Sequence, residues 1–130
     1  MAHLNSMKNF DRVRCPGMAE IVKVHSCGQR IGAIDNLGNL GIYTFDPAFH
    51  NSCVYAMKKA SAIDFCYLNP SVIAMISPLA VSVYDTLIHP KRQMKFKQSF
   101  SKDPIAISST KDNKIIVLRK NEVLIYDIRM

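Results

Sequence analysis

Short apolar runs recur along the chain, and turn-forming residues separate them. The runs are rich in Val, Ile, Tyr and Phe, the residue types that favour β-strands. We predict strands at 20–26, 30–35, 42–46, 53–58, 62–68, 72–77, 81–85, 93–100, 104–109, 114–119 and 124–127. Some runs, such as Val72–Ile76, are apolar throughout, which is typical of a sheet covered on both faces. No stretch predicts a helix, so the expected fold class is all-β.

Three of the predicted strands end in an aromatic residue followed by aspartate. The three pairs are Phe45–Asp46, Tyr84–Asp85 and Tyr126–Asp127, and the aspartates are 39 and 42 residues apart. WD repeats have a period of about 40 to 45 residues and carry Trp-Asp at this point. The chain has no Trp, so Phe or Tyr would take its place. The spacing predicts WD-type β-propeller blades.

The period divides the chain into units of about forty residues. We expect an N-terminal extension or partial strand at 1–18 and blades at 19–59, 60–100 and 101–130, the last without its outer strand. Propellers need at least four blades to close, so three blades would leave two sheet faces exposed and prone to self-association. We therefore expect a fragment of a longer chain, or a chain that assembles with a partner. A β-sandwich or closed barrel is the alternative for so many short strands.

The formal charge of +7 raises the question of an anionic ligand. The densest basic stretch contains Lys91, Arg92, Lys95, Lys97 and Lys102, and no acidic residue interrupts it. Apolar and basic residues alternate there, which predicts a strand with one basic face. That face is either solvated or binds a phosphoinositide or RNA.

Catalytic and metal-binding patterns are absent from the sequence. The four histidines are not spaced as a helical metal pair, and neither a nucleophile elbow nor a phosphate-binding loop occurs. We therefore expect no enzyme activity, no cofactor and no metal site. Five aspartates fall at turns or strand ends, where a carboxylate accepts backbone N–H groups, namely Asp35, Asp46, Asp85, Asp112 and Asp127.

The four cysteines are Cys15, Cys27, Cys53 and Cys66, and none forms a Cys-x-x-Cys pair. We expect them to be reduced and to act mostly as small core residues. No apolar run is long enough to span a membrane as a helix. The expected location is therefore the cytoplasm.

Four segments resemble the rabconnectin or DmX-like family of WD-repeat scaffolds. They are Gly28–Leu40, Ser61–Phe65, Val81–Pro90 and Arg119–Arg129, in the family's order and spacing. The chain departs from the family pattern in two clear places, with Tyr84 where the family has Trp and Asn121 where it has Gly. The resemblance covers roughly residues 20–129 and indicates a divergent copy of consecutive blades from the family's C-terminal propeller.

The resemblance implies a non-catalytic adaptor that helps to assemble the V-type proton ATPase and so governs vesicle acidification. The partners would then be ATPase subunits or the rest of the chain's own propeller, with peripheral attachment to endosomal or vacuolar membranes and no nucleic acid. We expect the partner surface at the corner after the second aromatic-Asp pair and along the basic strand that follows it. Its candidate residues are Thr86, Leu87, His89, Lys91, Arg92, Lys95 and Lys97.

Overall fold

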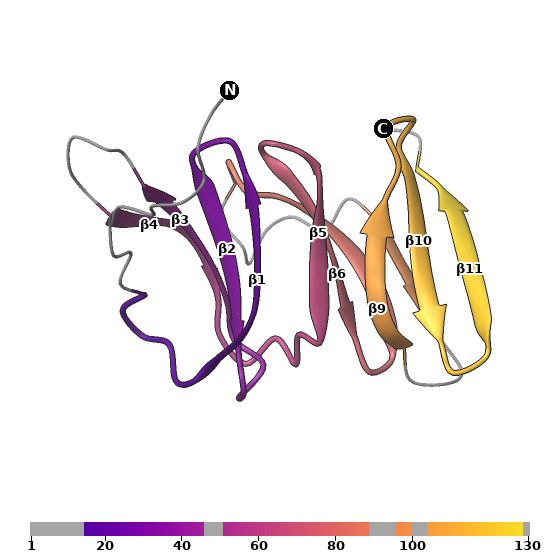
Figure 1. The fold of residues 1–130 in the computed structure, drawn as a ribbon, viewed down its shortest axis with the longest axis horizontal. Helices are drawn as coiled ribbons and strands as arrows, with labels where there is room; N and C mark the ends of the chain where they lie inside the picture. The colour runs from indigo at the N-terminus through magenta and orange to yellow at the C-terminus, as the bar shows by residue number, and fades with distance from the viewer. Residues whose placement is uncertain (1–14, 46–50, 89–95, 100–103, 129–130) are drawn as a thin grey trace, which may run out of the picture.

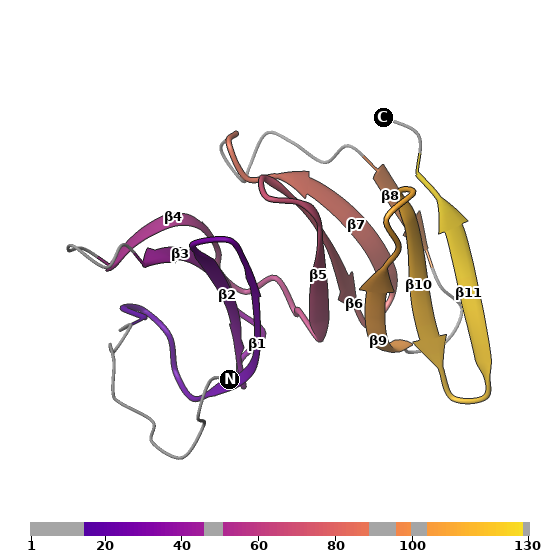
Figure 2. The same ribbon diagram turned by 45° about the horizontal axis from the view of Figure 1, so that its top comes forward.

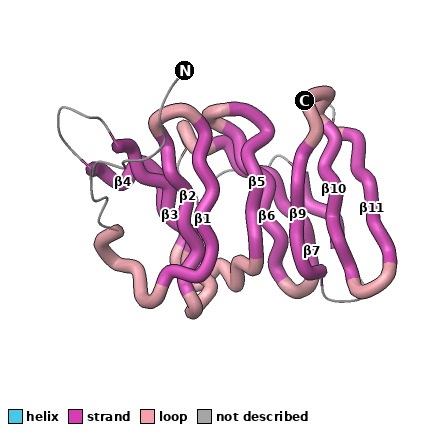
Figure 3. Tube along the Cα trace, viewed as in Figure 1, coloured by secondary structure: helices cyan, strands magenta, loops and turns pink. Residues whose placement is uncertain are grey.

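A computed structural model describes residues 15–45, 51–88, 96–99 and 104–128 (Figure 1). These residues form eleven strands and no helix, arranged in three antiparallel sheets (Figure 3). Sheet 1 contains β1 (Ile21–Cys27), β2 (Arg30–Asp35), β3 (Leu40–Phe45) and β4 (Asn51–Met57). Sheet 2 contains β5 (Asp64–Asn69), β6 (Val72–Ser77), β7 (Ala80–Asp85) and β8 (Phe96–Ser99). Sheet 3 contains β9 (Pro104–Ser109), β10 (Lys114–Arg119) and β11 (Glu122–Asp127).

Each predicted strand overlaps one observed strand, so the all-β prediction is confirmed. Within every sheet, neighbouring strands follow one another in the chain, as in a β-meander. The turns agree with local chemistry, because Gly28 between β1 and β2 has a φ of +62°. Gly38, in the β2–β3 connection, has a φ of +81° and lies so close to Ser61 that a Cβ would come within 2.9 Å of its Cα.

The sheets are stacked with sheet 2 in the middle (Figures 1 and 2). One apolar cluster joins sheets 1 and 2 and includes Ile34 and Ile42 on one side and Phe65 and Ile73 on the other. A second cluster joins sheets 2 and 3 through the residues Cys66, Val72, Ala74, Ile76, Val81, Val83, Ile107, Ile115, Val117 and Ile128. Sheet 2 is thus covered on both faces, which explains why Val72–Ile76 is buried along its whole length.

One buried carboxylate joins all three sheets. Asp64 on β5 accepts a hydrogen bond from the backbone N–H of Ile107 on β9 at 3.1 Å. Its other oxygen accepts the N–H of Phe65 at 2.9 Å and lies 3.0 Å from Nε2 of His25 on β1. The His25 ring also packs edge-on against Phe65, with centroids 5.0 Å apart.

A second buried aspartate organises the β2–β3 turn. Asp35 accepts hydrogen bonds from the backbone N–H groups of Ala19, Leu37 and Asn39 and from the Asn39 side chain, at 2.8–3.0 Å. Burial raises the pKa of Asp35, but these four bonds stabilise the carboxylate more strongly and lower its pKa to about 2. The prediction that Asp35 serves backbone donors at a turn is therefore confirmed.

Candidate protein-binding surfaces

The corner after β7 is held in place by hydrogen bonds to the β5–β6 turn. The backbone N–H and the hydroxyl of Thr86 both donate to the carbonyl of Ser71, at 2.7 and 2.6 Å. Asn69 orders that turn in its own right, because its side-chain oxygen accepts the N–H groups of Ser71 and Val72 at 2.9 Å. The corner is therefore tied by hydrogen bonds to the neighbouring turn of sheet 2.

Arg30 connects this corner to sheet 1. Its Nη1 donates to Oγ1 of Thr86 at 2.9 Å and to the carbonyl of Pro70 at 3.3 Å. Sequence reasoning did not single out Arg30. The sequence feature that could have indicated it is an arginine directly after a tight Gly-Gln turn, where the long arginine side chain can donate hydrogen bonds to the neighbouring sheet.

The structure describes only part of the predicted partner surface. Thr86 is buried and its hydroxyl is already engaged, so it positions the corner and does not face a partner. Leu87 is 71% exposed beside it, with its N–H bonded to Asp85 at 3.0 Å. His89, Lys91, Arg92 and Lys95 lie outside the described residues, and of Lys97 on β8 only the backbone is described.

The aromatic-Asp positions have different surroundings. Tyr84 is buried in the cluster between sheets 1 and 2, and Tyr126 packs against the cluster between sheets 2 and 3. Asp85 accepts the N–H of Leu87 in the corner, as predicted for an aspartate at a strand end. Phe45 ends β3, where only the backbone is described, and Asp46 lies outside the described residues. Asp127 ends β11 and is exposed.

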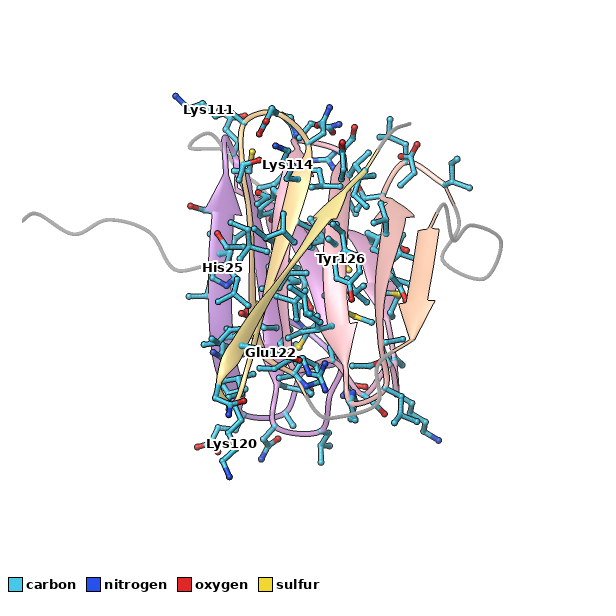
Figure 4. The ribbon with its side chains drawn as sticks, turned by 90° about the vertical axis from the view of Figure 1, so that its right-hand side faces the viewer. His25, Lys111, Lys114, Lys120, Glu122 and Tyr126 are labelled. Atoms are coloured by element: carbon cyan, nitrogen blue, oxygen red, sulfur yellow. The ribbon has the colours of Figure 1, made fainter. Side chains whose placement is uncertain are left out.

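The outer face of sheet 3, which we call the open face, is apolar and uncovered by the described residues. On β10 and β11 it presents Ile116, Leu118, Val123 and Ile125, because Ile116 lies opposite Ile125 and Leu118 opposite Val123. On β9 the same rows continue with Ser108 and Ala106. The alternate residues Ile115 and Val117 point the other way, into the cluster with sheet 2. Figure 4 views the molecule from this side.

The corresponding positions of sheet 2 are fully buried. In the β6–β7 ladder, Ala74 lies opposite Val83 and Ile76 opposite Val81, and sheet 3 covers all four. Val83 is 0% exposed, whereas Ile125 is 65% exposed. The open face thus carries the residue types of a buried sheet face, which is unusual for a solvated strand.

The described cysteines only partly follow the expectation of core thiols. All four are free, but Cys66 alone is buried, whereas Cys53 is exposed and Cys15 and Cys27 are half-buried. Burial raises the pKa of Cys66 to about 12. The expectation of mostly buried thiols was therefore wrong for Cys53, which lies on β4, an edge strand of sheet 1.

Within the described part of the chain, no three His, Cys, Asp or Glu side chains lie close enough to hold a metal ion. The same residues include no helix that could cross a membrane. No protein-family model matches the sequence. A search of curated proteins also finds no match.

Proposed function

We propose that this chain is a non-catalytic protein-binding scaffold built of WD-type propeller blades. The observation that carries the proposal is the open face, where Leu118, Val123 and Ile125 are exposed at positions that sheet 2 buries. A meander sheet with two apolar faces needs a neighbour on each, as blades of a propeller have. The repeat of an aromatic-Asp pair at the end of successive third strands supports the same assignment.

The resemblance to the rabconnectin or DmX-like scaffolds makes the V-type proton ATPase the first partner to test. In this proposal the chain acts in the cytoplasm, at endosomal or vacuolar membranes, and helps to assemble the pump. The proposed contact surfaces for its subunits are the open face and the corner at Leu87, which exposes a large apolar side chain on a hydrogen-bonded turn. Single substitutions can alter the open face and the corner at Leu87 independently.

The test is immunoprecipitation of the protein from its own cells, with the bound proteins identified by mass spectrometry. We expect subunits of the V-type ATPase with the natural chain and their loss with Ile125→Lys or Leu87→Lys. Val24→Lys is the matched control, because Val24 is also an exposed strand residue but lies on β1, away from both surfaces. Recovery of the chain alone, or only with copies of itself, would overturn the proposed function.

A further inference from the structure

Four connections between strands lie along one edge of the sheet stack, at the bottom of Figure 1. We call this the lower edge, and it comprises residues 36–39, 58–63, 78–79 and 120–121. Hydrogen bonds join its first three parts. The N–H of Ala62 donates to the carbonyl of Gly38 in the β2–β3 turn at 3.0 Å. The N–H of Ile63 donates to the carbonyl of Ile76, near the end of β6, at 2.8 Å.

Two leucines lie on corresponding turns of this edge, in neighbouring sheets. Leu37 in the β2–β3 turn is 69% exposed, and Leu79 in the β6–β7 turn is 68% exposed. Asp35 holds the first turn by accepting the N–H of Leu37, and Ser77 pairs with Ala80 on either side of the second. Tight turns favour small or polar residues and Pro, and exposing a large apolar side chain is costly. Neither leucine is needed to form its turn or the core.

Lysines accompany the leucines on the lower edge. Lys58 and Lys59 follow β4, Lys120 follows β10, and all three are exposed. The N–H of Lys59 donates to the side-chain oxygen of Asn39 at 2.7 Å, which ties this lysine to the turn that carries Leu37. Lys59 has a φ of +56°, a left-handed conformation that Gly or Asn adopts at lower cost. The charge is thus held at a conformationally costly position.

The exposed acidic groups near the lower edge do not cancel the lysines. Glu122 is bound by Arg119 at 2.6 Å, so this pair has no net charge. Glu20 lies beside the β2–β3 turn, because its carbonyl accepts the N–H of Asn36, and it offsets one lysine. The buried Asp35 accepts hydrogen bonds from backbone N–H groups and does not face solvent. The solvent-facing side of this edge is therefore net positive among the described residues.

We propose that the lower edge docks on an anionic lipid bilayer, with Leu37 and Leu79 between the headgroups and the lysines against lipid phosphates. Stacked sheets lie about 10 Å apart, and so do their corresponding turns. The segment 61–63 lies between the two turns, so the leucines form separate tips and not the continuous apolar centre of a protein interface. A bilayer accepts separate apolar tips, and its anionic lipids attract nearby lysines.

This inference deepens the proposed function, because it rests on the placement at a vesicle membrane and names the surface that makes the contact. The experiment is flotation of the purified 130-residue chain with vesicles of phosphatidylcholine, alone or with roughly one third phosphatidylserine. Flotation separates vesicle-bound protein from self-associated protein. We expect binding to the phosphatidylserine vesicles that weakens several-fold between about 50 and 200 mM salt.

Two sets of substitutions test the two parts of the contact. Leu37→Ser combined with Leu79→Ser should weaken partitioning onto anionic vesicles about tenfold. Lys58→Gln combined with Lys59→Gln should weaken it by about tenfold at low salt and little at high salt. Val24→Ser is the matched control, because it removes a 60% exposed apolar side chain from the middle of β1 and should leave partitioning unchanged. Circular dichroism shows whether the sheets of each variant are intact.

The chain's failure to float with phosphatidylserine vesicles at low salt would overturn the inference. Binding that the double leucine variant keeps and Val24→Ser loses would also overturn it. If the chain binds no vesicle and the leucine variant loses ATPase subunits in immunoprecipitation, the tips bind a protein instead. Vesicle binding without recovery of ATPase subunits would refute the proposed function and leave this inference standing.

Discussion

The carboxylate of Asp64 accepts the backbone N–H of Ile107 at 3.1 Å, which links two sheets across 43 residues of chain. His25 approaches the same carboxylate from the third sheet at 3.0 Å. A buried acceptor with donors on three separate sheets fixes how they sit relative to one another, since apolar contacts alone are not directional. The stack is therefore oriented by a polar contact inside an apolar interface.

Replacing Asp64 by Ala should destabilise the fold strongly. The N–H groups of Phe65 and Ile107 would lose their acceptor, and an unsatisfied buried donor costs about 1–3 kcal/mol. We expect the free energy of unfolding in urea to fall by about 2–4 kcal/mol. Asp85→Ala is the control, because among the described residues that carboxylate accepts the N–H of the exposed Leu87 and joins no two sheets. Equal losses for the two variants would contradict the special role of Asp64.

The contribution of His25 can be isolated by a double-mutant cycle with Asp64. Because Nε2 of His25 lies 3.0 Å from Oδ1 of Asp64, the combined His25→Ala and Asp64→Ala variant should lose less stability than the sum of the two single losses, by about 0.5–3 kcal/mol. The coupling is obtained from urea unfolding of all four proteins. Simple additivity would show that the two side chains act independently.

Acid should weaken the fold through Asp35. Its pKa is about 2 in the folded chain, against about 3.9 for an unperturbed aspartate. Between these two pH values the unfolded chain binds the proton more readily than the folded chain does. The contribution of Asp35 to the free energy of unfolding is therefore complete above about pH 4 and declines as the pH falls toward 2. We expect urea midpoints of the natural chain to fall through this window more steeply than those of Asp35→Asn. Parallel pH profiles would be inconsistent with the role assigned to this carboxylate.

The ring of Phe65 leaves no room for a side chain at position 32. A Cβ at this position would lie 2.6 Å from Cε2 of Phe65 and 2.9 Å from Cδ1 of Ile42, both fully buried. We expect Gly32→Ala to lower the free energy of unfolding by about 1–3 kcal/mol through overpacking. Phe65→Leu added to Gly32→Ala makes room and should cost less than the sum of the two changes. The absence of any such compensation in thermal unfolding would rule out the steric explanation.

The four thiols should react with iodoacetamide at different rates. Cys53 is exposed and should be alkylated first in the folded chain. Burial and the nearby charge of Asp64 raise the pKa of Cys66 to about 12, so its thiolate is scarce at pH 8 and its sulfur is shielded. Mass spectrometry should show Cys66 modified only after unfolding in urea. Equal labelling of Cys53 and Cys66 in the native protein would contradict the assigned burial.

Local sequence determined the strands and their turns. Gly28 and Asn69 act within a few residues of themselves, and the strands they separate, β1 from β2 and β5 from β6, lie close to where the apolar runs predict them. Asp35 and Asp85 also serve donors two residues away, which is why their roles could be anticipated.

Only the tertiary structure decided what lies between the sheets. Asp64 appeared as one polar residue inside a predicted strand, and its partners His25 and Ile107 are 39 and 43 residues distant. Likewise Val83 and Ile125 look alike in sequence, yet stacking buries the first and leaves the second exposed. The apolar pattern in the sequence shows that a sheet face must be covered. Which surface covers that face depends on contacts between strands far apart in the chain, and the arrangement of whole sheets decides those contacts.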